Sequence, residues 1–267
     1  MRFELHCHST CSDGSEPPER VAARAAERGV AVFALTDHDT CAGTGVAVAG
    51  GRSIRAVELS CSDDNQRTIH VLAYDKGGAW DHLTSRLDVL REARKNRVRV
   101  MATKLEMRGI KLEVEDLLEE ANLRSIGRPD LAKRIVAAGH ANSIKDAFSR
   151  HLYDGGPVDV PHRALSLADA IALGRDAGAA LSLAHPHMYD ERSAAMLRKY
   201  KAHGLDGIEA FHGAYDPRER SRWLAVADSL GLTCTGGSDW HGPEEARGLI
   251  GVDLPDDRSD ALLRWLG

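Results

Sequence analysis

The chain has 267 residues, with 43% hydrophobic residues, 28% charged residues and a formal net charge of −5. These values are ordinary for a soluble globular protein, and the length suits one large domain or a domain with an inserted lobe. The negative balance excludes a general attraction to duplex DNA or to an anionic membrane surface, but it is compatible with a small phosphorylated ligand. No signal peptide or membrane-length apolar run is visible, so we expect a cytoplasmic protein.

The first part of the chain alternates between short apolar runs and a helical pattern. An alanine-rich stretch at residues 17–28 predicts a helix, and apolar runs predict strands at residues 2–5, 31–36, 54–59 and 68–74. Strands that alternate with helices favour a parallel α/β arrangement.

The stretch from residue 76 to residue 165 contains no convincing strand. Helical patterns occupy most of it, at residues 81–109, 113–121, 130–138 and 143–151. A segment of this length is too long for a loop inside a compact domain. We therefore expect a helical insertion at residues 76–165.

The α/β alternation returns after this insertion. Strands are predicted at residues 179–184, 206–211 and 232–237, between helical patterns at 166–177, 191–203 and 216–230. Residues 1–75 and 166–267 would then form one seven-stranded unit. Its simplest closed arrangement is a barrel related to the (β/α) barrels, and an open doubly wound sheet is the alternative.

Histidine and carboxylate residues collect where the predicted strands end. They are His6, His8, Asp37, His38, Asp39, Glu58, His185, Glu209, His212, Asp239 and His241, with His70 inside the fourth strand. In a parallel barrel all strand ends open on one face, where active sites form. Imidazole and carboxylate suit zinc, manganese and iron, so this pattern predicts a polynuclear metal site. Asp13 could instead be a turn residue, and Asp239 could cap a helix.

Two cysteines are interleaved with the first of these residues. Side chains at positions i and i+2 of a strand face the same way, so His6 and His8 share one face and Cys7 points to the other. The chain has five cysteines and no C-x-x-C motif. We therefore expect reduced thiols that take no part in the metal site.

Seven short motifs, taken in order, resemble one known family. They are H-C-H (6–8), S-D-G (12–14), L-T-D-H-D (35–39), V-E-L-S (57–60), I-H-V-L (69–72), A-H-P (184–186) and G-S-D-W-H (237–241). As a set they resemble the PHP (polymerase and histidinol phosphatase) superfamily. The similarity is greatest to the stand-alone phosphoesterases that include nucleoside 3′,5′-bisphosphate phosphatases and small 5′→3′ exoribonucleases.

This resemblance implies a distorted seven-stranded (β/α)7 barrel that binds two to three divalent ions, with Mn²⁺ expected ahead of Fe²⁺ or Zn²⁺. One ion would be held by His6, His8, Glu58 and Asp239. A second would be held by Glu58, His70 and His185, and a third by Asp13, His38 and His241.

The resemblance also implies hydrolysis of phosphoesters by attack of a metal-bridging hydroxide on phosphorus. Small nucleotide substrates are expected, either nucleoside bisphosphates or short oligoribonucleotides. Asp37, His212 and His187 are candidates for acid or ligand-orienting roles, and His187 and His212 also for substrate binding. The helical insertion would supply specificity through Arg128, which starts a helix and suits a phosphate, although it could simply be a solvated residue beside a helix cap.

Two departures from the family pattern fall in the expected substrate pocket. Relatives often have G-K-P where this chain has Gly155-Gly156-Pro157, and many have A-H-P-G-R where it has AHPHM. The exact substrate is therefore open, with histidinol phosphate and cyclic or sugar phosphates as alternatives. Outside this chemistry, an amidohydrolase that cleaves C–N bonds would give no role to Asp13 and His38. A non-catalytic metal-binding module is the third interpretation.

Overall fold

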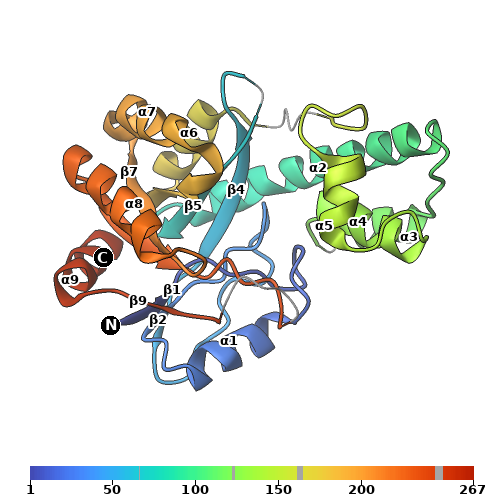
Figure 1. The fold of residues 1–267 in the computed structure, drawn as a ribbon. Coiled ribbons are helices and arrows are strands. Elements are labelled where there is room, and N and C mark those ends of the chain that lie inside the picture. Colours follow the sequence, from blue (N-terminus) through green and yellow to red (C-terminus); the bar gives the residue numbers. More distant parts are fainter. Residues whose placement is uncertain (66, 122–123, 161–164, 244–248) are drawn as a thin grey trace.

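The computed structural model describes residues 1–65, 67–121, 124–160, 165–243 and 249–267, and it has a mixed α/β fold (Figure 1). Helices and strands alternate along both ends of the chain, and a group of helices projects from the strands between them. Among these residues, no helix is both long enough and apolar enough to span a membrane.

The strands form two sheets. The first has the order β3-β2-β1-β9 and consists of β1 (Arg2–Glu4), β2 (Val32–Phe33), β3 (Arg52–Ser53) and β9 (Val252–Asp253). The second has the order β4-β5-β6-β7-β8 and consists of β4 (Ala56–Ser62), β5 (Thr68–Asp75), β6 (Ala179–Leu183), β7 (Leu205–His212) and β8 (Thr233–Gly237). The strands β3 and β9 were not predicted, because strands of two residues carry no readable periodicity.

The strand pairing differs from the single closed seven-stranded barrel that was expected. The strands form a four-stranded and a five-stranded sheet, and isolated bridges between Cys7 and Trp240 and between His38 and Glu58 join the two sheets. The expected parallel order is also wrong in part, since β5 runs antiparallel to both β4 and β6. The connection between β4 and β5 is too short for the crossover that a parallel pair needs.

This antiparallel strand still delivers its histidine to the expected edge. His70 lies near the start of β5 and pairs with Ser60 near the end of β4. A strand that runs in the opposite direction presents its first residues where its neighbours present their last ones. The reversal therefore brings His70 to the same end of the sheet as Glu58.

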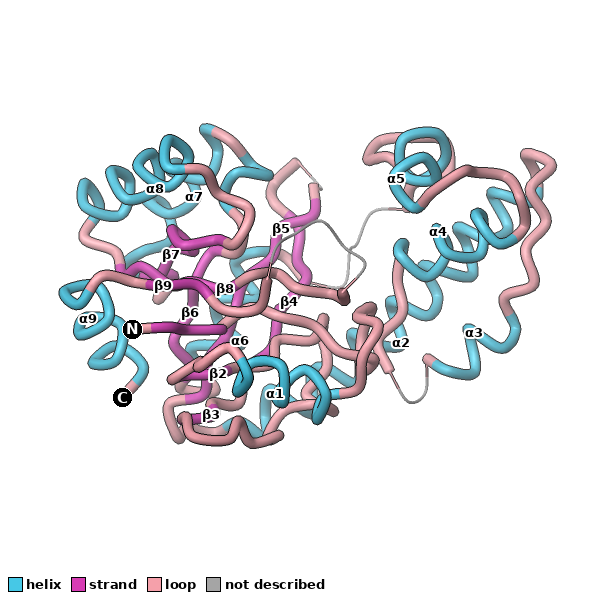
Figure 2. The backbone as a smooth tube through the Cα atoms, turned by 60° about the horizontal axis from the view of Figure 1, so that its bottom comes forward, coloured by secondary structure: helices cyan, strands magenta, loops and turns pink. Residues whose placement is uncertain are grey.

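Helices cover the outer faces of the sheets. The helix α1 (Pro18–Glu27) buries Val21 and Ala25 against Phe33 of β2. The five-stranded sheet is covered by α6 (Leu167–Asp176), α7 (Glu191–Tyr200), α8 (Pro217–Leu230) and α9 (Asp256–Leu266) (Figures 1 and 2). Short 3₁₀ turns lie at Pro186–Tyr189 and Lys201–His203.

The projecting helices share one long element with the main core. The helix α2 (Trp80–Glu106) buries Leu83 and Leu87 in the core of the sheets, whereas its later residues Val98 and Met101 belong to a separate core. That second core is completed by α3 (Glu115–Glu120), α4 (Arg128–Ala137), α5 (Ile144–Ala147) and a π-helical turn (Phe148–Leu152) (Figure 2). All of these helices fall within the predicted insertion, of which residues 122–123 and 161–164 lie outside the described residues.

Candidate metal centre

The first motif reaches the site directly from β1. His6 and His8 follow this strand, and both side chains are fully buried. Cys7 lies between them in the sequence but packs with Val21 and Phe33 beneath α1. The alternation of side chains along the extended backbone thus separates the imidazoles from the thiol, as predicted.

The carboxylate of Glu58 is the centre of a ring of histidines. Its Oε2 atom lies 3.4 Å from His6 Nε2, 3.2 Å from His8 Nε2 and 3.1 Å from His38 Nδ1. Its Oε1 atom lies 3.0 Å from His70 Nδ1 and 3.1 Å from His185 Nε2. One buried carboxylate of β4 therefore faces five imidazoles that come from four separate segments of the chain.

Asp239 faces two of these histidines, His6 and His8, and also His241. Its Oδ1 atom lies 3.5 Å from His6 Nε2, 3.4 Å from His8 Nε2 and 3.6 Å from His241 Nδ1. The backbone holds it there, since its N–H donates a 2.7 Å hydrogen bond to the carbonyl of His6. The residue has a positive φ of 53°, a conformation that Asp tolerates better than most residues. Asp239 does not cap a described helix.

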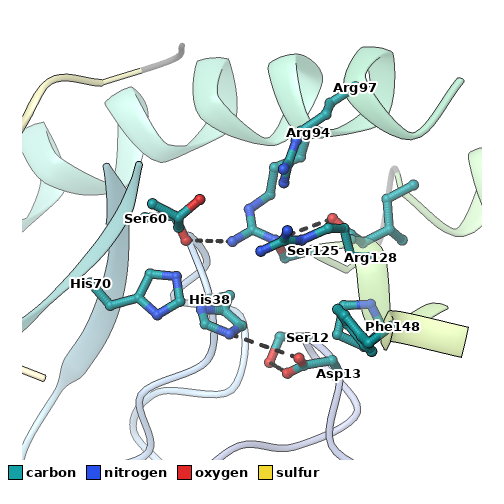
Figure 3. A pocket seen from close by; sticks show the side chains of 14 residues that line it. Ser12, Asp13, His38, Ser60, His70, Arg94, Arg97, Ser125, Arg128 and Phe148 are labelled. Atoms are coloured by element: carbon teal, nitrogen blue, oxygen red, sulfur yellow. Dashed lines mark hydrogen bonds and ion pairs between the residues drawn. The ribbon is translucent and has the colours of Figure 1, made fainter. Parts of the chain in front are cut away.

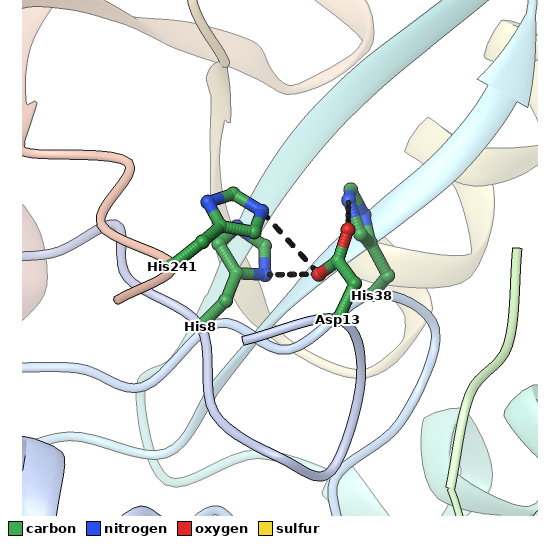
Figure 4. Close-up of side chains that lie close together, drawn as sticks. All are labelled: His8, Asp13, His38 and His241. Carbon is green, nitrogen blue, oxygen red and sulfur yellow. Dashed lines mark ion pairs between the residues drawn. The ribbon is translucent and has the colours of Figure 1, made fainter. Parts of the chain in front are cut away.

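Asp13 is the third carboxylate of the site, after Glu58 and Asp239. Figure 3 shows it beside His38, and Figure 4 shows His8 and His241 on its other side. The Oδ1 atom is 3.3 Å from His241 Nε2 and 3.7 Å from His8 Nδ1, and the Oδ2 atom is 3.8 Å from His38 Nε2. Asp13 is therefore more than a turn residue, because its carboxylate points into a cage formed by the imidazoles of His8, His38 and His241.

Unpartnered atoms show what this arrangement can hold. His6 Nε2, His8 Nε2, His38 Nδ1 and Glu58 Oε2 are buried and have no hydrogen-bond partner among the described residues. Buried polar atoms without partners are costly, and such atoms are rare unless an ion or ligand completes them. Ligand atoms within 4.8 Å of one another occur in three overlapping groups, which are His8, Asp13, His38 and His241; His6, His8 and Glu58; and His38, Glu58 and His70. The donor set fits divalent metal ions that accept nitrogen and oxygen ligands.

The electrostatics keep the carboxylates ionised. Burial raises the pKa of Glu58, but the surrounding histidines, with His38 and His70 first among them, together lower it by more, so that this pKa lies well below its usual range. The same balance holds for Asp13 beside His241 and for Asp239 beside His6. The site therefore presents charged carboxylates, which is the form that binds cations.

Glu209 orients His6 and His185 through hydrogen bonds. It lies on β7 with its side chain fully buried, and its Oε1 atom is 2.9 Å from His6 Nδ1. Its Oε2 atom accepts a 2.6 Å hydrogen bond from the backbone N–H of His185. Glu209 was predicted near a strand end, among the residues of a polynuclear metal site, but without a role of its own. A carboxylate inside the apolar run 206–211 was the available signal.

Asp37 binds the loop between His8 and Asp13. Its carboxylate accepts hydrogen bonds from the backbone N–H of Ser9 (2.8 Å), the hydroxyl of Ser9 (2.7 Å) and the hydroxyl of Ser12 (2.6 Å). With these donors it holds the loop that carries Asp13. The geometry gives Asp37 a positioning role through this loop.

His187 and His212 form one wall of the cavity above the metal centre, whose volume is about 400 Å³. His187 Nδ1 is 3.0 Å from the hydroxyl of Tyr215. Burial and the neighbouring His212 lower the pKa of His187 to about 4, so this imidazole is neutral at pH 7. His212 Nδ1 accepts a 3.1 Å hydrogen bond from the backbone N–H of Ala214. With Nδ1 as the acceptor, the ring N–H is on Nε2.

Arg128 begins α4, with Pro129 in the first helical turn, as predicted. Its guanidinium forms an ion pair with Asp154 and also donates to the carbonyl of Leu152. The side chain lines a cavity together with Arg94 and Arg97 of α2 (Figure 3). These two arginines were not singled out from the sequence, because nothing in the helical period of α2 distinguishes them from its other basic residues.

Comparisons with known proteins agree with this geometry. Residues 4–125 match the family model described as PHP domain. A 3′,5′-nucleoside bisphosphate phosphatase of Chromobacterium violaceum is 33% identical over 264 residues, which cover 95% of this chain and 92% of that protein. The 5′-3′ exoribonuclease Rnm of Salmonella typhimurium is 31% identical over 255 residues, which cover 90% of this chain and 85% of that protein.

A solved structure is similar over the whole fold. The structure of a candidate metal-dependent phosphoesterase from Bifidobacterium adolescentis superimposes with a TM-score of 0.85 at 30% identity. The match covers 98% of this chain and 96% of that chain. The similarity therefore includes both sheets and the projecting helices.

Proposed function

The chain belongs to the PHP domain family and is a metal-dependent phosphoesterase, and we propose that its substrates are nucleoside bisphosphates. Short oligoribonucleotides are the related second candidate, because one of the similar relatives is named as an exoribonuclease. The two substrate classes share a phosphate group attached to ribose, next to a second phosphate in the same molecule.

The convergence of imidazoles on Glu58 is the observation that carries the proposal. The residues that would hold divalent ions are His6, His8, Asp13, His38, Glu58, His70, His185, Asp239 and His241. Every one of them contacts Glu58, Asp239 or Asp13 within 3.8 Å, or is one of these three carboxylates. Bound divalent ions lower the pKa of water and neutralise charge on phosphoryl oxygens.

Asp13 and His38 support phosphoester rather than amide hydrolysis. An amidohydrolase site would give no role to these residues, yet both face the cage, and Asp13 reaches His241, His8 and His38. A third cation subsite at Asp13 suits the several negative charges of a phosphoryl group. A carboxamide, which is neutral, would gain nothing from it.

His212 is the best placed donor of a proton to the leaving oxygen. Its Nδ1 accepts the N–H of Ala214, so its ring N–H is on Nε2, which lies 3.8 Å from Asp239 Oδ2, and the residue lines the cavity. His187 lies beside it and is neutral at pH 7, which suits hydrogen bonding to substrate better than proton donation. Departure of an alkoxide needs a proton, and a positioned imidazole N–H can supply one.

A release assay over a small substrate panel tests the proposal. Protein reconstituted with Mn²⁺ would be offered adenosine 3′,5′-bisphosphate, a 5′-phosphorylated dinucleotide, histidinol phosphate, a cyclic ribose phosphate and an amide. We expect phosphate or nucleotide release from the first two substrates. Faster hydrolysis of histidinol phosphate or of the cyclic phosphate would replace the nucleotide assignment, and amide hydrolysis without phosphate release would favour an amidohydrolase.

A further inference from the structure

The helical insertion holds the loop that carries Asp13. The guanidinium of Arg124 donates a 2.8 Å hydrogen bond to the carbonyl of Ser12, and Nζ of Lys133 donates a 3.2 Å hydrogen bond to the carbonyl of Asp13 itself. These donors lie 112 and 120 residues further along the chain than their acceptors. The insertion therefore reaches the backbone of this metal-centre loop at two successive residues.

A third hydrogen bond joins the same two segments. The backbone N–H of Ser125 donates a 2.9 Å hydrogen bond to the carbonyl of Cys11. The carbonyls of residues 11, 12 and 13 thus all accept hydrogen bonds from the insertion. Because peptide groups are planar, holding three successive carbonyls fixes the backbone at Asp13 and leaves its carboxylate only the side-chain torsions.

Two carboxylates hold the Arg124 guanidinium in its orientation. Its Nη2 atom lies 2.8 Å from Glu120 Oε2 and 2.8 Å from Asp130 Oδ1. The other oxygen of Asp130 accepts a 2.8 Å hydrogen bond from the N–H of Gly127, and the Asp130 side chain is only 5% exposed. Since these carboxylates compensate its charge, Arg124 supplies the loop with a directed N–H donor rather than with net positive charge.

The other side of the loop is held by the part of the chain that forms the sheets. Asp37 accepts hydrogen bonds from Ser9 and Ser12, and the N–H of Ser15 donates a 2.7 Å hydrogen bond to the carbonyl of His241. The loop therefore lies between the sheets and the insertion and is bonded to both. A shift of the insertion would move Asp13 relative to the histidines that it faces.

We propose that Arg124 and Lys133 are positioning residues for the cation subsite at Asp13. By holding the carbonyls of Ser12 and Asp13, they keep the Asp13 carboxylate directed at His241 and at the other histidines of its cage. This inference rests on the proposed metal-dependent function. It makes occupancy of this one subsite depend on the helical insertion, whereas ions beside Glu58 of β4 should not depend on these two residues.

Calorimetric titration of the metal-free protein with Mn²⁺ tests the proposal without any substrate. The binding phase that Asp13→Asn abolishes identifies the ion at the Asp13 subsite. In Arg124→Met the affinity of this phase should fall by about 10–100-fold, as it does when an outer partner of a metal ligand is lost. In Lys133→Met, which loses one longer hydrogen bond, it should fall by about threefold. The remaining phases should keep their affinities.

Arg134→Met is the matched control. Arg134 follows Lys133 on α4 but pairs with Asp116 near the surface, so its loss should leave every phase as it is. Thermal unfolding of the metal-free proteins would check that each variant folds. Lys133 is exposed, so Lys133→Met should fold even if Arg124→Met does not. Arg124→Lys keeps the charge but loses the planar fork, and it should bind this ion with intermediate affinity.

A double substitution separates positioning from contact with the substrate. Asp13→Asn has already lost the ion in question, so adding Lys133→Met should not reduce its phosphate release further. In the protein that retains Asp13, the same Lys133→Met change should reduce phosphate release at limiting Mn²⁺, and excess Mn²⁺ should restore it. A residue that only stabilised the fold would not show this recovery.

The possible outcomes are distinct. Weaker binding confined to the Asp13 phase supports the inference. Unchanged binding in the folded variants overturns it, as does an equal loss in every phase or the absence of any phase that depends on Asp13. Additive losses of phosphate release would place Lys133 on the substrate and overturn its positioning role. Absence of phosphate release from every substrate removes the proposed function, while the Mn²⁺ titration still decides the roles of Arg124 and Lys133.

Discussion

Arg94 and Asp39 form a buried ion pair that joins the projecting helices to the metal centre. The Arg94 Nε to Asp39 Oδ2 distance is 2.5 Å, and the other carboxylate oxygen of Asp39 accepts a 2.7 Å hydrogen bond from the N–H of Ser60. Asp39 follows His38 in the chain and has a positive φ of 49°. The pair therefore links α2 to the loop of His38 and to the strand that carries Glu58.

Replacing Arg94 with Met should be strongly destabilising. The change leaves the buried carboxylate of Asp39 without its cation, which costs about 3–5 kcal/mol when one partner of a buried pair is lost. Urea-induced unfolding would measure the change in the free energy of unfolding. Arg91→Met removes an arginine paired with Asp88 near the surface of the same helix and should cost less than about 1 kcal/mol. Equal effects of the two substitutions would contradict the structural role of the pair.

Replacing Glu209 with Gln should weaken metal binding. The carboxylate accepts the hydrogen bond from His6 Nδ1 and thereby directs His6 Nε2 toward Glu58. Loss of such an outer partner costs about 10–100-fold in metal affinity. Calorimetric titration of the metal-free protein with Mn²⁺ would measure the change. Glu191→Gln makes the same change at an exposed position on α7 and should leave the affinity as it is. An unaltered affinity in Glu209→Gln would exclude this orienting role.

Replacing Asp13 with Asn should remove about one metal ion per chain. The neutral amide no longer balances the positive charge of a cation beside His241 and His38. Phosphate release should fall by about 100-fold, equivalent to a few kcal/mol of lost charge stabilisation. Elemental analysis after dialysis would count the ions, and Asp63→Asn, far from the cage in the β4–β5 hairpin, would serve as the control. Full metal content and full phosphate release in Asp13→Asn would contradict a metal-holding role for Asp13.

Removal of metal should lower the thermal stability of the protein. An ion at 100 times its dissociation constant stabilises the folded state by about 2.7 kcal/mol, which corresponds to an increase in Tm of about 5–10 °C for a chain of this size. Differential scanning calorimetry with and without a chelator would measure the shift. Glu58→Gln removes the carboxylate that faces five histidines, so its Tm should respond much less to added Mn²⁺. An equal increase in both proteins would mean that the ions bind elsewhere.

The motifs at the strand ends were readable because their chemistry is local. Two histidines at positions i and i+2 of a strand must share a face, so His6 and His8 could be assigned to one site and Cys7 to the core before any fold was known. The apolar runs likewise identified the long strands, from Ala56–Ser62 onward. The sequence by itself thus determined which residue types could meet a metal ion, and at which ends of which elements.

The tertiary structure decided the partnerships. Periodicity assigns a face to a residue but not the residue that it meets, so Glu209 behind His6 and Arg94 against Asp39 could not be predicted. The direction of β5 depended on how two neighbouring strands are connected and paired, and the two sheets are joined only by isolated bridges among the described residues. The cavity beside Arg97 and Arg128 exists because α2 and α4, far apart in the chain, pack around a second core of their own.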